Sequence, residues 1–227
     1  IGTRCRAVKD AVRDTAYFIQ GERKRFSQQD VGYKGWNDLV TYVDQQSEAR
    51  LVSALNEILP EAGVLAEEAH TELETDKAYN WIIDPLDGTL NFVHRLPMYA
   101  VSVALQRGST MELGVVYEPN SDECFYAVRG QGAYLNGERL YISETSEVAN
   151  ALFATGFPTP EHEAIAPYTR ILNYLLTQSR GVRRFGSAAM DLCYTAAGRF
   201  DAYYEYGLKP WDVAAGALIV QEAGGTV

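Results

Sequence analysis

The sequence predicts an α+β fold, and three observations point to that class. Two segments near the start carry apolar residues at helical spacing, the middle of the chain shows short alternating strands between turn residues, and the last third alternates between strands and helices. With 227 residues, 47% of them hydrophobic, the chain is long enough to bury a sizeable core. We therefore expect helices first, then an antiparallel meander sheet, then a mixed α/β unit.

The two N-terminal helices are predicted at residues 7–25 and in the segment that follows Asp44. Apolar side chains recur there every three or four positions, with charged residues between them. Pro60 and Gly63 end the second helix, because the residue before a proline is disfavoured in helical backbone and glycine is typical just beyond a helix end. The apolar positions are Val8, Val12, Ala16 and Ile19 in the first helix and Ala49, Leu51, Val52, Leu55, Ile58 and Leu59 in the second.

Two short apolar runs, residues 64–66 and 81–83, each end in acidic residues. Their length favours buried strands whose ends face a site. Between Tyr99 and Tyr141 four groups of turn residues interrupt the strand pattern, which predicts an antiparallel meander. These groups are residues 107–109, 119–122, 130–132 and 136–137.

The last third predicts a second layered unit with crossover helices. Its strands are expected at residues 151–156, 182–185 and 201–206, and its helices at residues 165–178, 188–198 and 213–223. We expect residues 1–145 to form an N-terminal α+β part and residues 146–227 a C-terminal α/β part, fused as one compact unit. Another strand is expected to begin at residues 224–227, which suggests a shortened C-terminus.

Charge and cysteine content narrow the function classes. The net charge of -10 argues against nucleic acid as a partner, because phosphate contacts depend on clustered Lys and Arg. An acidic enzyme still binds phosphate when metal ions supply the positive charge. Cys5, Cys124 and Cys193 are widely spaced, which indicates neither a disulfide framework nor a zinc site and fits a reducing cytoplasm. No apolar run reaches the ~20 residues that span a bilayer, so no membrane partner is expected.

A tight turn after residues 81–83 is predicted to present the carboxylates of Asp84 and Asp87 together. Pro85 fixes one backbone angle of this turn, and Gly88 permits an unusual one. Neighbouring carboxylates repel each other unless a cation or proton lies between them, and Mg²⁺ prefers oxygen ligands. On the turn alone, an ordinary acidic turn in which Asp87 and Thr89 cap a helix explains the pattern slightly better.

Two further acidic positions change that balance. Glu67-Glu68 follows the neighbouring apolar run, and Asp212 opens the last predicted helix. Separately they have ordinary explanations, a solvated acidic pair and a helix N-cap. Three acidic strand ends or helix starts in one chain make a metal site the stronger hypothesis.

Three motifs in this order resemble those of the inositol monophosphatase family, and the similarity covers essentially the whole chain. The motifs are Glu67-Glu68, then residues 81–92 (WIIDPLDGTLNF), then residues 211–225 (WDVAAGALIVQEAGG). The resemblance implies a layered α/β/α/β/α sugar-phosphatase fold, hydrolysis of a phosphate monoester, and two or three Mg²⁺ ions as cofactors. It also implies a homodimer and inhibition by Li⁺.

The resemblance assigns roles to individual positions. It implies metal ligation by the side chains of Glu67, Asp84, Asp87 and Asp212 and by the carbonyl oxygen of Leu86. Catalytic roles fall on Asp44, Thr89 and Glu67, with the first two orienting or deprotonating the attacking water. In two-metal catalysis one ion activates the water and the other stabilises the leaving oxygen. Ala66 and Ala69 replace the family's usual Gly and Ser around the paired glutamates, so Glu68 is given only a supporting role.

The resemblance also places residues around the substrate. These are Asp87, Gly88, Thr89, Gly186, Ser187, Ala188, Glu205 and Asp212. A carboxylate and free N–H groups at a helix start suit adjacent hydroxyls. Two alternatives stay open: Gly186-Ser187 as a simple helix cap and Glu205 as a surface acid. The tyrosines at 203, 204 and 206 are interpreted as strand packing, the arginines of residues 180–184 as solvated, and the three histidines as non-ligands.

Inositol monophosphate is the leading substrate, because residues 201–212 look most like the inositol branch of the family. Fructose 1,6-bisphosphate, adenosine 3',5'-bisphosphate and histidinol phosphate are the alternatives, since a few contacts decide such a choice. From another class, the chain would be a non-catalytic metal or phosphate sensor on the same fold.

Overall fold

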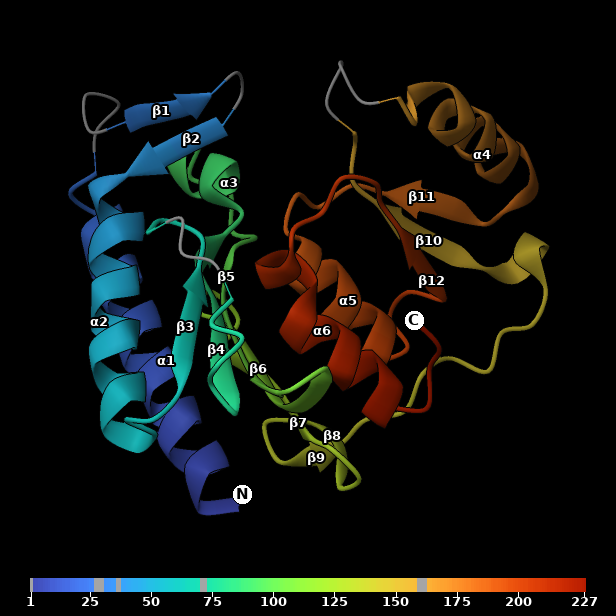
Figure 1. The fold of residues 1–227 in the computed structure, drawn as a ribbon. Helices are drawn as coiled ribbons and strands as arrows, with labels where there is room; N and C mark the ends of the chain where they lie inside the picture. The colour runs from blue at the N-terminus through green and yellow to red at the C-terminus, as the bar shows by residue number, and fades with distance from the viewer. Residues whose placement is uncertain (1, 27–30, 36–37, 70–72, 159–162) are drawn as a thin grey trace.

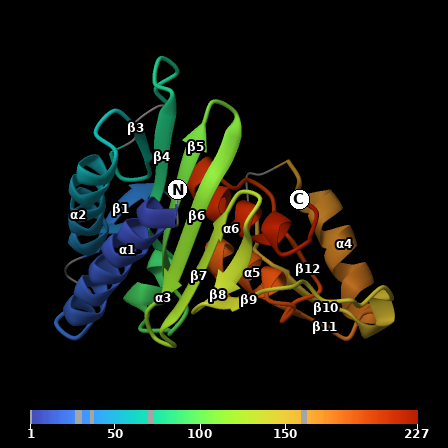
Figure 2. The ribbon, with the colours of Figure 1, turned by 90° about the horizontal axis from the view of Figure 1, so that it is seen from below.

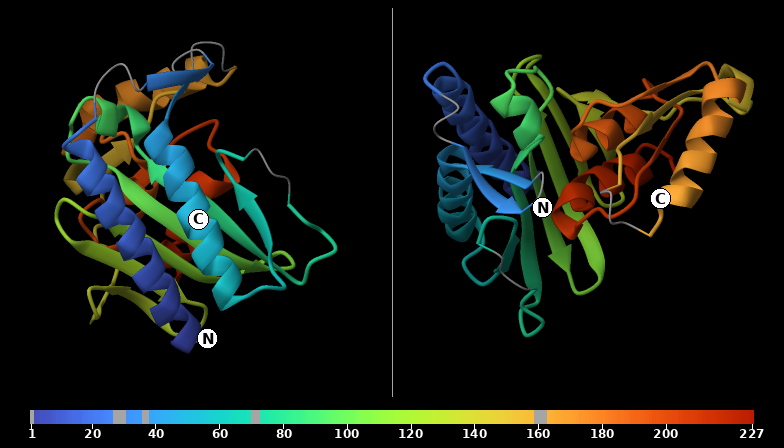
Figure 3. Two further views of the ribbon diagram at one scale, coloured as in Figure 1. Left: turned by 90° about the vertical axis from the view of Figure 1, so that its left-hand side faces the viewer. Right: turned by 90° about the horizontal axis from the view of Figure 1, so that it is seen from above.

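Five layers of secondary structure make up the protein in the computed structural model, which describes residues 2–26, 31–35, 38–69, 73–158 and 163–227. Two helices cover one face of a large sheet, two more cover its other face, and a small sheet and a last helix complete the stack (Figure 1). The same order is visible from above in Figure 3. This arrangement confirms the layered α/β/α/β/α fold.

The first layer consists of α1 (Gly2–Arg23) and α2 (Tyr42–Ile58), which pack side by side against the large sheet (Figure 3). Their apolar stripes are buried as the spacing predicts, although α1 begins earlier than expected. A hairpin of β1 (Val31–Gly35) and β2 (Asp38–Thr41), absent from the sequence prediction, leads directly into α2.

The large sheet has seven strands in chain order, and both of its faces are covered by helices (Figure 2). Only β3 and β4 pair in parallel; every other neighbouring pair is antiparallel, which confirms the meander. The strands are β3 (Gly63–Ala66), β4 (Tyr79–Asp87), β5 (Ala100–Arg107), β6 (Thr110–Glu118), β7 (Glu123–Val128), β8 (Gly132–Leu135) and β9 (Glu138–Arg139).

The end of β4 differs from the prediction. The strand continues through both acidic residues, whereas the sequence predicted that it would end before Asp84. Asp84 pairs with Ser102 and Asp87 with Ala100. The advance of three residues along β4 therefore lies opposite an advance of two residues along β5, which makes a β-bulge. Such a bulge bends a strand and re-aims its side chains, and it is also where a proline such as Pro85 is tolerated within a sheet.

The second sheet contains three parallel strands in the order β11, β10, β12. Helices α4 and α5 connect these strands, as the alternating pattern predicts, and α6 follows them. Pro210 stands at the first turn of α6, where its fixed φ suits a helix start, so this helix begins three residues earlier than expected. The elements are η2 (Val148–Asn150), β10 (Leu152–Thr155), α4 (Ile165–Gln178), β11 (Gly181–Arg183), α5 (Ala188–Ala196), β12 (Ala202–Tyr204) and α6 (Pro210–Glu222).

Two hydrophobic clusters lie on the two faces of the large sheet. One joins the sheet to α1 and α2 around Trp81 and Tyr117, and the other joins it to α5 and α6 around Phe125 and Ile219. The three cysteines are buried and free. Within the described residues, no helix is long and apolar enough to cross a membrane. The proposed division at residue 145 stays a prediction.

Candidate active site

Asp44 and Thr89 meet at the start of α2. Thr41 is the N-cap of that helix, and its backbone N–H donates to Asp44 Oδ2 at 2.8 Å in a reciprocal capping box. The same Oδ2 accepts from Thr41 Oγ1 at 2.5 Å, while Oδ1 accepts from Thr89 Oγ1 at 2.9 Å. The capping box therefore holds a buried carboxylate with one oxygen facing Thr89.

Thr89 also lies beside the carbonyl oxygen of Leu86, with 3.0 Å between that oxygen and Thr89 Oγ1. A hydroxyl carries one hydrogen, so it donates fully to only one of these two acceptors. Asp84 lies just upstream, and its Oδ1 accepts from the Leu86 N–H at 3.0 Å. A continuous polar strip therefore runs from the bulged end of β4 to the start of α2. It consists of Asp84, Leu86, Thr89 and Asp44.

Asp87 connects this strip to α5. Its Oδ2 accepts hydrogen bonds from Ser187 Oγ at 2.6 Å and from the Ala189 N–H at 2.7 Å. Ser187 is also the N-cap of α5, accepting from the Met190 N–H at 3.4 Å. Ser187 therefore caps the helix and also contacts a predicted metal ligand, while its contact with substrate stays a prediction.

Gly88 allows the chain to turn between β4 and the short helix α3 (Thr89–Val93). Its φ is +94°, and a Cβ there would lie 2.9 Å from the carbonyl oxygen of Met98. Gly88 is itself the N-cap of α3, without a side-chain cap. The capping roles considered for Asp87 and Thr89 are thus not the ones that these side chains have here.

Four carboxylates interact through their charges. Burial raises the pKa of Asp84 well above its ordinary value, and the charges of Glu67, Asp87 and Asp212 raise it further. Burial likewise raises the pKa of Asp87 to about 6 and that of Asp212 to about 7, although a hydrogen bond from the Lys209 N–H opposes the latter shift. The predicted ligands therefore share one region of unbalanced negative charge.

This donor set suits Mg²⁺ by its chemistry. Among the described residues, no three His, Cys, Asp or Glu side chains are arranged so that they would hold a metal ion by themselves. Magnesium, however, usually takes only one or two carboxylates and completes its shell with water and substrate phosphate. All the predicted donors are oxygen atoms, and a cation would offset the repulsion that raises the pKa of Asp84.

Glu48 organises the loop after β3 that carries Glu67 and Glu68. This buried α2 side chain accepts from the Glu68 N–H at 2.7 Å through Oε2 and from the Ala69 N–H at 2.8 Å through Oε1. Sequence reasoning missed Glu48, because a single acid within an amphipathic helix looks like a solvated residue. Ala69 stands where the family usually has serine, and its backbone N–H still makes this contact with Glu48.

Glu205 lies after β12, next to the tyrosines. Its Oε2 accepts from Tyr203 Oη at 2.6 Å, and burial raises the pKa of its carboxyl group. Asp191 on α5 is 1% exposed, and burial followed by the charges of Asp87 and Glu205 raises its pKa to about 8. Glu205 is thus half-buried rather than a surface acid, and Asp191 is a buried neighbour that the sequence did not indicate.

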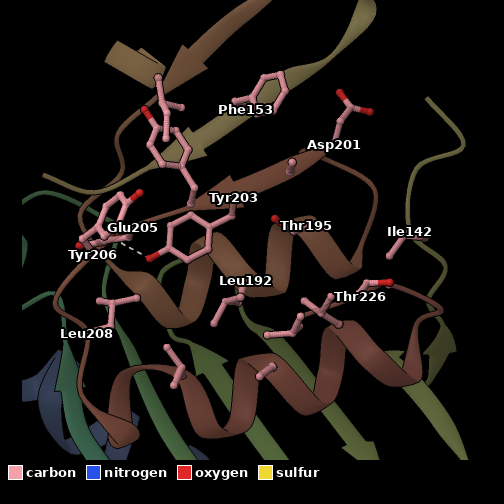
Figure 4. A pocket seen from close by; sticks show the side chains of 18 of the residues that line it. Ile142, Phe153, Leu192, Thr195, Asp201, Tyr203, Glu205, Tyr206, Leu208 and Thr226 are labelled. Atoms are coloured by element: carbon pink, nitrogen blue, oxygen red, sulfur yellow. Dashed lines mark hydrogen bonds between the residues drawn. The ribbon is translucent and has the colours of Figure 1, made fainter. Parts of the chain in front are cut away.

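A cavity of about 660 Å³ lies between β12 and helices α5 and α6 (Figure 4). Tyr203 and Glu205 line one side of it, and the predicted metal ligands do not line it. Most other lining side chains are apolar, among them Ile142, Phe153, Leu192, Val213 and Val220. Of the predicted substrate contacts, Glu205 is the one that lines this cavity, so the cavity adjoins the polar site at Glu205.

Residues 5–227 match the model of the inositol monophosphatase family. The chain belongs to this family. Nus factor SuhB of Salmonella typhimurium is 46% identical over 194 residues, which cover 86% of this chain and 73% of that protein. The sequence resemblance is therefore confirmed.

Solved structures of inositol monophosphatases have the same fold. The enzyme from Anabaena (Nostoc) sp. PCC 7120 superimposes with a TM-score of 0.84 at 35% identity, over 98% of this chain and 82% of that one. SaIMPase-II, solved with bound inositol monophosphate, gives a TM-score of 0.79 at 26% identity, over 96% of this chain and 78% of that one. This agreement extends over nearly the whole chain.

Other sequence predictions are placed as follows. His94 is exposed, and His70 and His162 lie outside the described residues. Arg180, Arg183 and Arg184 are exposed, as expected for solvated side chains. Gly186 stands directly before Ser187 with a φ of +84°, and Ala188 is the first residue of α5, so the predicted substrate segment forms the turn into that helix.

Proposed function

We propose that this chain is a Mg²⁺-dependent phosphomonoesterase that hydrolyses a small polyol phosphate, with inositol monophosphate as the first candidate. The hydrogen bond from Thr89 to Asp44 beside four interacting carboxylates carries the proposal. It pairs an acid with a hydroxyl next to groups that suit a cation. General acid–base catalysis needs such a pair within hydrogen-bonding reach of the reacting water.

Each residue of the site has a proposed task. Two or three Mg²⁺ ions would be held by Glu67, Asp84, Asp87, Asp212 and the Leu86 carbonyl oxygen. When bound, such ions lower the pKa of a water molecule and stabilise the charge on the leaving oxygen. When Thr89 Oγ1 donates to Asp44 Oδ1, it has lone pairs left to accept from the attacking water. Asp44 would take up the proton through Thr89.

The phosphate and polyol would lie between β4 and the start of α5. The N–H groups of Gly88 and Thr89 are proposed to hold the phosphate. Ser187 supports this geometry because its hydroxyl ties Asp87 to the start of α5. Asp87, Asp212, Gly186, Ser187, Ala188 and Glu205 are the proposed contacts of the alcohol part.

Inositol monophosphate is favoured by the relative SaIMPase-II, which was solved with that compound bound. The same enzyme was also solved with 2'AMP bound. The substrate panel therefore contains inositol monophosphate, 2'AMP, fructose 1,6-bisphosphate, adenosine 3',5'-bisphosphate and histidinol phosphate. We propose to measure phosphate release from this panel with and without Mg²⁺. The highest kcat/KM is expected for inositol monophosphate, and a large preference for a nucleotide bisphosphate would contradict the assignment.

A second candidate function comes from the 46% identity to Nus factor SuhB. This role is tested separately from the hydrolysis of a phosphate ester. Complementation of a bacterial strain that lacks its SuhB separates the two, using wild type and Asp44→Asn. Rescue by both proteins supports the Nus-factor role, and rescue by wild type alone links the role to hydrolysis. A non-catalytic sensor would instead bind Mg²⁺ and phosphate esters without releasing phosphate.

We also propose a homodimer located in the cytoplasm. Three buried free cysteines suit a reducing compartment. Light scattering after size-exclusion chromatography tests the dimer directly, and a monomeric mass across micromolar concentrations would contradict it.

A further inference from the structure

The carboxylate of Glu205 is fixed on one side by a neighbouring side chain of the same strand segment. Tyr203 Oη donates to Glu205 Oε2 at 2.6 Å, and both residues face the same space in Figure 4. The Tyr203 ring packs against the cluster formed by α5, α6 and the large sheet. The phenol is therefore anchored at its ring and holds the carboxylate through its hydroxyl.

On another side the same carboxylate lies over Gly156, directly after the last residue of β10. A Cβ at residue 156 would overlap Cδ, Oε1 and Oε2 of Glu205. The backbone directly before it is held in the small sheet, because the buried Thr155 pairs with Tyr204 of β12 and its Oγ1 lies 2.8 Å from the Tyr204 carbonyl oxygen. Any side chain at 156 would therefore displace the Glu205 carboxylate and not the strand.

We propose that Tyr203 and Gly156 are positioning residues that fix the Glu205 carboxylate and thereby set the preference for hydroxyl-rich phosphate esters. The inference rests on the proposed function, because it concerns how the alcohol part of the ester is recognised. A carboxylate has about four acceptor positions, and Tyr203 occupies one of them. The remaining positions suit the hydroxyls of a polyol only while the group is held in one orientation.

The first test compares two esters with Tyr203→Phe, Gly156→Ala and Glu205→Gln. Inositol 1-phosphate carries hydroxyls for Glu205, whereas p-nitrophenyl phosphate has none. The ratio of kcat/KM for inositol 1-phosphate to that for p-nitrophenyl phosphate should fall about tenfold or more, the scale of a lost hydrogen bond to a charged group. The change should appear mainly as a higher KM for inositol 1-phosphate, with a smaller change in kcat.

Matched controls make the same two chemical changes elsewhere in the chain. Tyr126→Phe deletes a phenol hydroxyl on β7, and Gly21→Ala adds a methyl group where no atom lies within 4 Å. Both should keep the wild-type ratio. An unchanged ratio in Tyr203→Phe and Gly156→Ala, in proteins with wild-type Tm, would overturn the proposal.

A double-mutant cycle tests the mechanism further. If Gly156→Ala acts by displacing Glu205, it should lower the ratio in the wild type and have no further effect in a Glu205→Ala background. Additive effects would show that Gly156 acts by another route and would overturn the proposal. Absence of phosphate release from every ester by the wild type would instead contradict the proposed function. If the wild type prefers another hydroxyl-bearing ester, the same ratio is measured with that ester.

Discussion

Asp44 and Thr89 lie 45 positions apart in the sequence, yet Thr89 Oγ1 donates to Asp44 Oδ1 at 2.9 Å. Thr41, the N-cap of α2, holds the other oxygen of this carboxylate through its N–H and its hydroxyl. The first turn of a helix therefore orients an acid toward the hydroxyl of a residue from another segment. Burial raises the pKa of Asp44, although the hydrogen bonds from Thr41 and Thr89 oppose this shift.

Removal of the Thr89 hydroxyl should abolish most of the turnover. Thr89→Val keeps the shape of the side chain and loses the group that would orient water, so kcat should fall by about 10²- to 10⁴-fold. Thr89→Ser keeps the hydroxyl and should retain activity within about tenfold. Steady-state phosphate release by both variants checks this, and equal activities would exclude a role for the hydroxyl.

Replacement of Asp87 by Asn should separate metal binding from folding. Both hydrogen bonds at Asp87 arrive at Oδ2, so a single amide oxygen can accept them from Ser187 and Ala189. Without Mg²⁺ the variant should be at least as stable as the wild type, because one repelling charge is removed. Its kcat should fall by about 10²- to 10³-fold.

Thermal unfolding with EDTA and with Mg²⁺ gives the second measurement for Asp87→Asn. A ligand that binds only the folded state at 100 times its Kd stabilises by about 2.7 kcal/mol, so Mg²⁺ should raise the Tm of the wild type. The rise should be smaller in the variant. Asp76→Asn, on an exposed turn, is the control and should behave as wild type. A full Mg²⁺-dependent rise in Asp87→Asn would contradict its assignment as a ligand.

Glu48 should matter for metal affinity although it is not a proposed ligand. Glutamine has one acceptor oxygen in place of two, so Glu48→Gln leaves either the Glu68 or the Ala69 N–H unpaired. We expect a loss of about 1–3 kcal/mol in the free energy of unfolding and about a tenfold rise in the Mg²⁺ concentration for half-maximal activity. Glu57→Gln, exposed on the same helix, should change neither quantity.

Local sequence patterns were sufficient for much of the fold. The apolar spacing at residues 165–178 predicts α4 with the ends that the structure has, because those side chains and the flanking residues act over a few positions. The acidic strand ends were also readable, since Glu67, Asp84 and Asp87 follow short apolar runs. The pairing of Asp44 with Thr89 came only with the family resemblance.

Contacts between distant segments were not predictable in the same way. The sequence predicted a tight turn directly after residues 81–83, but pairing with β5 extends β4 through a bulge. The alternating tyrosines of β12 look like packing residues, and only the folded chain brings the Tyr203 hydroxyl to Glu205. Gly156 carries no pattern at all, because its lack of a side chain matters only where another residue lies over it.

Two glycines in left-handed conformations should respond differently to alanine. Gly88 has a φ of +94° and backbone atoms of Met98 against it, whereas Gly130 has a φ of +73° and no atom within 4 Å of an added Cβ. Gly130→Ala should lose about 1–2 kcal/mol, the cost of a left-handed residue with a side chain. Gly88→Ala should lose more and should also be inactive, because the turn that carries Thr89 must shift. Urea unfolding and activity assays check both, and equal losses would contradict the steric argument.

Asp201 should make stability depend on pH outside the active site. Burial pushes the pKa of this carboxyl group up, but hydrogen bonds from Ser143 Oγ at 2.5 Å and from the Leu152 N–H at 2.6 Å outweigh burial, and the pKa is lowered. Because the folded-state pKa is below the unfolded value of about 3.9, the stabilisation is complete above that value and is lost as the pH falls through the folded-state pKa.

Asp201→Asn should therefore lower the free energy of unfolding at pH 7 by about 1 kcal/mol, the scale of one hydrogen bond. The difference from wild type should begin to shrink as the pH falls below about 4 and should vanish below the folded-state pKa, where both side chains are neutral. Urea unfolding at a series of pH values checks this, with Asp14→Asn on the exposed face of α1 as the control. A difference that stays constant down to the lowest pH at which the protein folds would show that the charge of Asp201 does not contribute.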